Sequence, residues 1–185
     1  MKSTLYILSL LVMFISCTKQ SELSKTFNCN TSKIKNLEVY TDFKNNFKIS
    51  IPTNWKTQLY YNDFQSEIFT ADTTKQLSET YIIDAAFNYG NLEFSSEFYK
   101  KTDSIIALSN FQKVKSDTLK FKSKPAYYYV VTGTKKGFTY NQFNLLVKLS
   151  PETYFTAYSE IYGINTIDER ICESITLLNS IEFLQ

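Results

Sequence analysis

The chain has 185 residues, of which 20 are basic and 18 acidic, and it contains no histidine. A net charge of +2, spread without blocks of like charge, argues against a nucleic acid or another polyanion as the partner. The lack of histidine removes the usual base of Ser-His-Asp and Cys-His sites, and the lack of a C-x-x-C pair argues further against zinc. The four glycines are isolated and the aspartates are scattered, so neither a phosphate-binding loop nor a calcium loop is expected. The composition therefore predicts no metal and no cofactor.

Residues 1–16 have the features of a signal peptide. Lys2 gives the start a positive charge, and residues 5–15 form an apolar run too short to cross a hydrocarbon core of about 30 Å as a helix. The sequence FISC at 14–17 resembles a bacterial lipobox, with phenylalanine where leucine is usual. This resemblance implies cleavage before Cys17, a diacylglycerol thioether on its sulfur, and an acyl chain such as palmitate on its new amino group.

A lipid on Cys17 would also determine where the protein is located. Two or three acyl chains, at about 0.8 kcal/mol per buried methylene, hold a protein firmly on a bilayer. Residues 18–22, directly after Cys17, contain a single acid, Glu22, where the surface-export signals of some bacteria place acidic pairs. We therefore expect a lipoprotein of the bacterial cell envelope that is anchored in a membrane and faces the periplasm. The alternative is an ordinary cleaved signal peptide followed by an incidental cysteine.

The three cysteines divide between this lipid and a possible bridge. With Cys17 lipidated, Cys29 and Cys172 remain, and the envelope outside the inner membrane is oxidising. A Cys29–Cys172 disulfide would close a loop of about 144 residues and contribute up to about 4–5 kcal/mol on the chain-entropy model. The alternative is that both cysteines are buried free thiols.

The segment after the lipid site is expected to be a spacer. Residues 18–26 are polar and lack periodicity, which predicts a flexible tether that lifts the domain off the membrane. The ordered part is expected to begin between Cys29 and Asp42. The chain therefore divides into a signal peptide at 1–16, a lipidated N-terminus and tether at 17–40, and one domain at 41–185.

The domain shows strand patterns that are interrupted by two helical patterns. Strands are expected at residues 47–52, 56–61, 67–71, 80–89, 113–121, 125–133, 138–149 and 153–162, with a short final run at 180–184. Apolar residues at helical spacing predict one helix over 94–108 and a second over 167–178, which Thr166 and Glu169 would open with a capping box. This order predicts an α+β domain with a mostly antiparallel sheet, in which residues 125–162 form a meander.

Three stretches of the domain resemble the PsbP-like superfamily: FKISIPTNWK from residue 47, KPAYYYVVTG from residue 124 and ICESITLLNSIEF from residue 171. This family includes the PsbP subunit of photosystem II, a nuclear Ran-release factor and bacterial envelope proteins of the DcrB type. The resemblance covers roughly residues 42–185 and implies an antiparallel sheet flanked by helices, with a non-catalytic binding or assembly role. The ion-binding histidines of the photosystem protein have no counterpart in this chain, and no Ran-contacting residues can be matched.

One face of the predicted meander carries a row of tyrosines. Strand side chains alternate between two faces, so the positions opposite the apolar ones include Tyr140, Tyr154, Tyr158 and Tyr162. Tyrosines are favoured at interfaces because they bury a large area at a low cost in entropy. We therefore expect these four residues to form a candidate binding surface, unless a helix covers them. Trp55 is expected to fill the core rather than to form a ligand platform.

Paired acids are the remaining route to catalysis. Asp84, Glu160 and Glu79 could supply carboxylates of the kind that hydrolyse glycosidic bonds, although 18 acids make chance pairs common. The sequence therefore predicts a non-catalytic envelope lipoprotein that binds another protein or a small ligand. The alternative is a carboxylate-dependent envelope enzyme such as a glycan hydrolase. Two acids that converge in a pocket would favour the enzyme, and a flat tyrosine-rich face would favour the binder.

Overall fold

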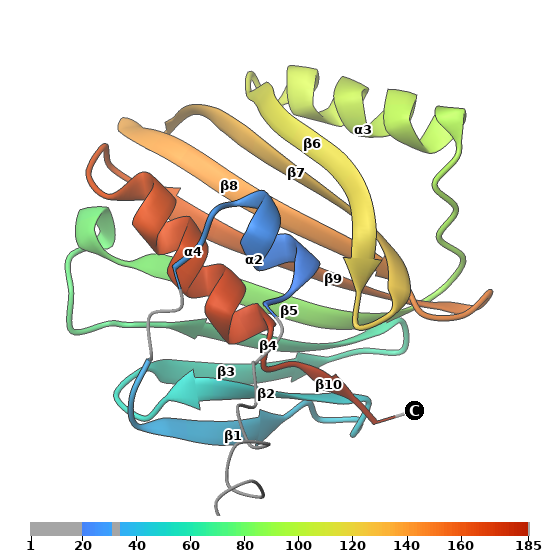
Figure 1. The fold of residues 1–185 in the computed structure, drawn as a ribbon, viewed down its shortest axis with the longest axis horizontal. Coiled ribbons are helices and arrows are strands. Elements are labelled where there is room, and N and C mark those ends of the chain that lie inside the picture. The colour runs from blue at the N-terminus through green and yellow to red at the C-terminus, as the bar shows by residue number, and fades with distance from the viewer. Residues whose placement is uncertain (1–19, 31–33, 185) are drawn as a thin grey trace, which may run out of the picture.

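The computed structural model describes residues 20–30 and 34–184. The chain folds into two antiparallel sheets with helices packed against them (Figure 1). Cys17 and the predicted signal peptide lie outside the described residues. In the described part of the chain, no helix is long and apolar enough to span a membrane.

The larger sheet has seven strands. Their order across the sheet is β3 (Lys56–Tyr61), β4 (Gln65–Ala71), β5 (Tyr81–Tyr89), β9 (Thr153–Tyr162), β8 (Phe138–Lys148), β7 (Lys124–Lys135) and β6 (Gln112–Phe121). The smaller sheet has three strands in the order β1 (Leu37–Thr41), β2 (Phe47–Pro52) and β10 (Glu182–Phe183). The predicted meander is present as β7, β8 and β9, which pair in sequence order.

The helices are α2 (Glu22–Thr26), α3 (Ser96–Leu108), α4 (Ile167–Leu178) and a 3-10 turn, η1 (Leu77–Glu79). The α+β class, the mostly antiparallel sheet and the flanking helices are confirmed. The predicted strand at 180–184 is shorter than expected and covers only Glu182–Phe183.

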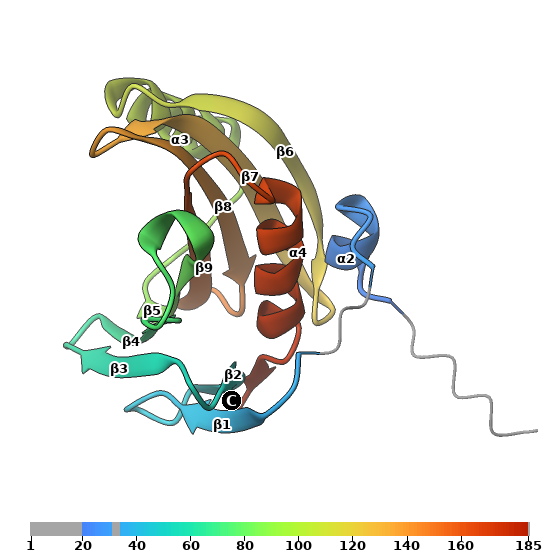
Figure 2. The same cartoon turned by 90° about the vertical axis from the view of Figure 1, so that its left-hand side faces the viewer.

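The core lies between the large sheet, α4 and the small sheet. Because side chains alternate along a strand, one side of β8 and β9 is apolar and the other is polar. The buried side chains of this core include Phe47, Ile49, Ile51, Phe143, Leu145, Val147, Phe155, Ala157, Ile161, Ile171, Ile175 and Leu178. We call this side of the large sheet the core face and the other side the outer face. Figure 2 shows α4 beside the core face and α3 on the opposite side of the sheet.

Helix α2 corrects the prediction of a tether over residues 18–26. Ser21 caps the helix by accepting a hydrogen bond from the backbone N–H of Ser24. Leu23 is only 1% exposed and belongs to the core, and Phe27 packs edge-on against Tyr128. A five-residue helix is not stable alone, so this packing between α4 and β6 is what orders it. The ordered structure therefore begins well before the predicted boundary at 29–42.

The predicted disulfide is present. Cys29 and Cys172 are joined with a Cα–Cα distance of 5.2 Å. Cys29 follows α2 and Cys172 lies in the middle of α4, so the bond ties the first ordered segment to the C-terminal helix. A Cys29–Cys172 bond also leaves neither cysteine free as a thiol.

The start of α4 differs from the predicted capping box. The helix begins at Ile167, as expected, but Thr166 has a φ of 48° and its side chain makes no capping hydrogen bond. Arg170 holds this end of the helix instead. Its guanidinium is buried and donates to the carbonyl oxygens of Ser78, Thr80, Tyr162 and Asn165.

Candidate functional site

The outer face of β5, β9 and β8 carries the four predicted tyrosines and two of the predicted acids, Asp84 and Glu160. The strand register places Asp84 directly opposite Tyr158, and Tyr158 opposite Asn144 on the next strand. Glu160 lies two residues further along β9 on the same face. Aromatic, amide and carboxyl groups therefore meet on the middle of the large sheet, on the side away from α4.

Glu160 is the centre of one group of contacts. Its carboxylate accepts hydrogen bonds from Tyr140 at 2.8 Å, from Tyr162 at 3.0 Å and from Lys135 at 2.5 Å. Burial alone would raise the pKa of Glu160, but these hydrogen bonds outweigh it and lower the pKa below its ordinary value. Burial and the neighbouring Glu160 carboxylate together raise the pKa of Tyr140. Glu160 is therefore ionised and Tyr140 neutral at ordinary pH.

Asp84 behaves in the opposite way. Its side chain is 8% exposed and accepts a 2.6 Å hydrogen bond from the Tyr158 hydroxyl. Burial raises the pKa of Asp84 to about 7, although the Tyr158 hydrogen bond opposes the rise. The charges of Glu67 and Glu160 add to it. Asp84 therefore changes its protonation near neutral pH.

The four predicted tyrosines are not equally accessible. Tyr140 and Tyr162 are 1% and 3% exposed, so the expectation that they are surface anchors is wrong. Phe111, which follows α3, stacks on Tyr140 with ring centroids 5.1 Å apart, and Tyr162 packs edge-on against Tyr140, also at 5.1 Å. Tyr154 and Tyr158 are half-buried and remain available on the outer face.

Helix α3 packs mainly against Tyr127, which is not one of the four predicted tyrosines. Phe98 and Tyr99 pack against Tyr127 of β7, with ring centroids 5.8 and 5.1 Å apart. The covering helix therefore lies over β7, which β8 separates from β9, the strand that carries Tyr154 and Tyr158. Sequence reasoning missed the Asp84–Tyr158 pair, although an aspartate between the apolar residues Ile83 and Ala85 of β5 was a usable signal.

The predicted carboxylates are partly brought together. Asp84 and Glu160 share the outer face, whereas Glu79 lies on η1. Within residues 20–30 and 34–184, no three acidic or cysteine side chains form a group that could hold a metal ion.

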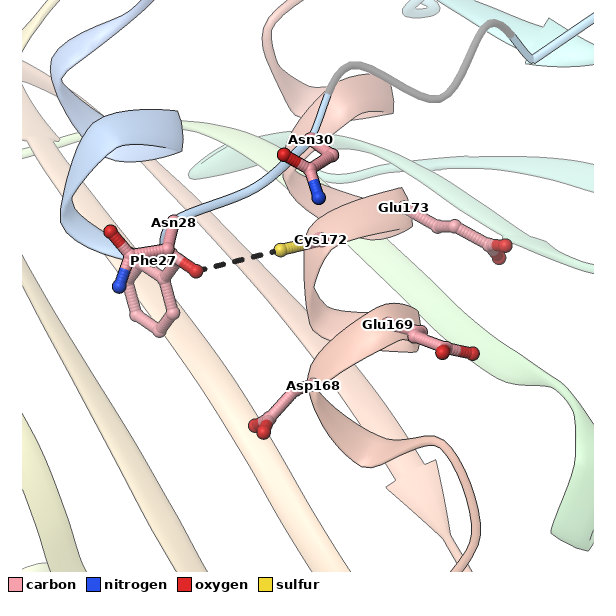
Figure 3. A pocket seen from close by; sticks show the side chains of 7 residues that line it. All are labelled: Phe27, Asn28, Asn30, Asp168, Glu169, Cys172 and Glu173. Carbon is pink, nitrogen blue, oxygen red and sulfur yellow. Dashed lines mark hydrogen bonds between the residues drawn. The ribbon is translucent and has the colours of Figure 1, made fainter.

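A cleft lies elsewhere on the domain. It has a volume of about 530 Å³ and lies beside the disulfide, between the end of α2 and the first turns of α4 (Figure 3). Three carboxylates of α4 line it: Asp168, Glu169 and Glu173. The sulfur of Cys172 is 3.8 Å from the Phe27 carbonyl oxygen; since a disulfide sulfur has no hydrogen to donate, we interpret this as a packing contact.

A second cleft, of about 370 Å³, is lined by Trp55 and Tyr81 among other residues. Trp55 packs edge-on against Tyr81 at 5.1 Å and adjoins the core, as expected of a core-filling residue. Neither of these two clefts contains Asp84 or Glu160.

Comparison of the sequence with family models and with curated proteins gives no match. Solved structures do match the fold. The cyanobacterial PsbP protein (CyanoP) of Synechocystis sp. PCC 6803 superposes with a TM-score of 0.54 at 8% identity, over 84% of this chain and 96% of that one. The Ran-binding protein Mog1p of Saccharomyces cerevisiae gives 0.53 at 10% identity, over 81% and 96%. A Bacteroides thetaiotaomicron protein gives 0.55 at 10% identity, and the matched 81% of this chain corresponds to about half of that longer chain.

These similarities define the class of fold. At identities of 8 to 10%, they show a PsbP-like α+β domain and nothing about activity.

Proposed function

We propose that this protein is a lipid-anchored, non-catalytic protein of the bacterial cell envelope whose outer face binds another protein or a small ligand. The observation that carries the proposal is the set of half-buried aromatic and polar groups on the outer face of β9, centred on Tyr154 and Tyr158. Rings that expose a hydroxyl beside amides and carboxyls are typical of binding surfaces. Mog1p, which shares the fold, is itself a Ran-binding protein.

The envelope location rests on the leader sequence and on the cysteines. The apolar run that ends at Cys17 supports a lipid anchor. The Cys29–Cys172 disulfide suits an oxidising compartment such as the periplasm, because cytosolic thiols are kept reduced.

The test of the binding proposal is partner capture by crosslinking from native envelopes. We expect Tyr158→Ala or Tyr154→Ala to weaken capture about tenfold or more, which corresponds to about 1.4 kcal/mol. Capture should persist at high salt because the chain is nearly neutral. Tyr40→Ala is a matched control, because Tyr40 is also half-buried and its hydroxyl also contacts a carboxylate, but it lies on the small sheet. Equal capture by all four proteins would reject the outer face as the binding surface.

A second candidate function is favoured by one observation. Asp84, with a pKa of about 7, and the ionised Glu160 lie on the same face, and acids whose pKa values are pushed apart suit a general acid and its partner. If this protein is a glycan hydrolase, the purified wild type will release reducing ends from envelope glycans, and Asp84→Asn and Glu160→Gln will both abolish the release. A wild type without such activity leaves binding as the function.

A further inference from the structure

The two edges of the large sheet are treated differently by the fold. At one edge, β6 carries Lys113, Lys115 and Lys120 and is flanked by α2. The backbone N–H of Lys120 donates to the Glu22 carboxylate at 2.9 Å, and the Lys115 ammonium donates to the carbonyl of Thr26. Lysines and a covering segment are the usual protection of an edge strand against unwanted pairing. The β6 edge is therefore protected against pairing with another strand.

The other edge, β3, lacks this protection. It pairs only with β4 in the sheet, and among the described residues no main-chain hydrogen bond beyond that ladder involves residues 56–61. Five of its six side chains are exposed, including Leu59, Tyr60 and Tyr61, and it has one lysine, Lys56. An edge of this kind presents unpaired N–H and C=O groups, whose natural partner is another extended main chain.

An exposed aromatic cluster lies at the end of this edge. The rings of Phe43 and Tyr61 are stacked with centroids 3.9 Å apart, and both are more than half exposed. Phe64, in the turn after β3, is 75% exposed, and its carbonyl accepts a hydrogen bond from the N–H of Tyr89, whose ring is also exposed. The Lys44 ammonium lies 4.9 Å from the Tyr89 ring centre and donates to the turn at the end of β3. Clusters of exposed rings mark interaction surfaces.

We propose that the β3 edge binds an extended segment of another protein, which adds to the large sheet as an eighth strand. The register of β3 defines the chemistry of that segment. Leu59 and Tyr61 lie on the core face side, whereas Gln58 and Tyr60 lie on the outer face side. The segment therefore alternates apolar and polar residues, and its apolar positions pack beside Leu59 and Tyr61 and reach the aromatic cluster. This site is separate from the outer face of β9.

The probe is a synthetic peptide of about ten residues that alternates valine and threonine. Its control has the same length and the same sequence except that proline replaces two central residues, since proline cannot donate to a ladder. With the full-length protein at saturating peptide, hydrogen exchange of backbone amides within residues 56–61 should slow by roughly tenfold. The proline peptide should leave these rates unchanged.

Two variants distinguish binding at the β3 edge from non-specific binding of the peptide. Leu59→Lys places a charge on the proposed contact and should abolish the protection, and Phe64→Ala should weaken it by removing a ring of the aromatic cluster. Thr118→Lys, an exposed position on the protected β6 edge, is the matched control and should bind normally. Unchanged exchange at β3, or protection confined to other elements, would overturn the proposal. Protection that rises with protein concentration in the absence of peptide would also overturn it, in favour of pairing with a second copy of the chain.

Discussion

Asp84 is a carboxyl group that the fold holds close to its titration point. Burial on the outer face raises its pKa from the ordinary value of 3.8 to about 7, while Tyr158 donates a 2.6 Å hydrogen bond to it. The folded protein therefore keeps a proton on Asp84 at pH values at which the unfolded chain has already lost it. Stability that depends on this proton is present below about pH 4 and is lost as the pH rises through about 7.

We predict that Asp84→Asn removes this part of the pH dependence. The asparagine carbonyl can still accept from Tyr158, and it carries no charge to desolvate, so the variant should be more stable than the wild type at pH 8 and similar at about pH 3.5, below both pKa values. The gain has an upper limit of about 4 kcal/mol, the free energy that corresponds to the difference between pKa values of 3.8 and about 7. Urea unfolding at the two pH values measures it. The exposed Asp63→Asn is the control, and an equal pH dependence in Asp84→Asn and wild type would contradict the assignment.

At the scale of elements, Arg170 joins three of them. From the first turn of α4, its guanidinium reaches η1 and the following residue through the carbonyls of Ser78 and Thr80, and the end of β9 through Tyr162. Each of these carbonyls would be left without that partner if the guanidinium were removed, and an unsatisfied buried polar group costs about 1–3 kcal/mol.

We predict that Arg170→Met lowers the free energy of unfolding by about 3 kcal/mol or more, since methionine fills much of the space but donates to none of the carbonyls. The free energy of unfolding of Arg170→Lys should lie between those of Arg170→Met and the wild type, because one ammonium cannot reproduce the planar fork of donors of the guanidinium. Urea denaturation provides the measurement. A loss below about 1 kcal/mol for Arg170→Met would show that the hydrogen bonds of Arg170 are not important for stability.

The disulfide gives a second prediction at this scale. Cys172→Ala should lower the melting temperature of the oxidised protein, with a loss of at most about 4–5 kcal/mol on the chain-entropy model. The same variant and the wild type should melt together in the presence of a reductant, which serves as the control. Faster hydrogen exchange in α2 should accompany the change, because Cys29 fixes the segment that follows this helix. An unchanged melting temperature under oxidising conditions would contradict this role.

The sequence predicted most strands and both long helices because their apolar periodicity is local. It did not predict α2, whose five residues depend on contacts of Leu23 and Phe27 with distant parts of the chain. Asp84 and Tyr158 were each noted in the sequence, but their pairing was not predicted, because it joins residues 74 positions apart and requires the strand order of the sheet. In the same way, the burial of Tyr140 depends on Phe111, which no periodic pattern connects to it.

At the scale of the whole molecule, the lipid anchor is the prediction with the widest consequence. Mass spectrometry of the mature amino terminus should find acyl groups on Cys17, and Cys17→Ser should appear as a soluble or uncleaved protein. Lys19→Ser is a suitable control, because it changes a neighbouring residue and should leave the protein in the membrane fraction. A mature terminus at another residue, without lipid, would contradict the lipoprotein proposal.

If Cys17 carries the predicted lipid, the docked helix α2 leaves only a short segment of chain between the lipid and the folded domain. Gln20 is already bound to the domain, its side-chain amide donating to the carbonyl of Cys29 at 2.8 Å. At no more than about 3.6 Å per residue, the step from Cys17 to Gln20 allows a reach of about 11 Å. With Cys17 in the bilayer, the side of the domain that carries α2 and α4 would rest on the lipid headgroups. The outer face lies on the opposite side of the sheet (Figure 2), so a partner would approach it from the aqueous side, without crossing the membrane surface.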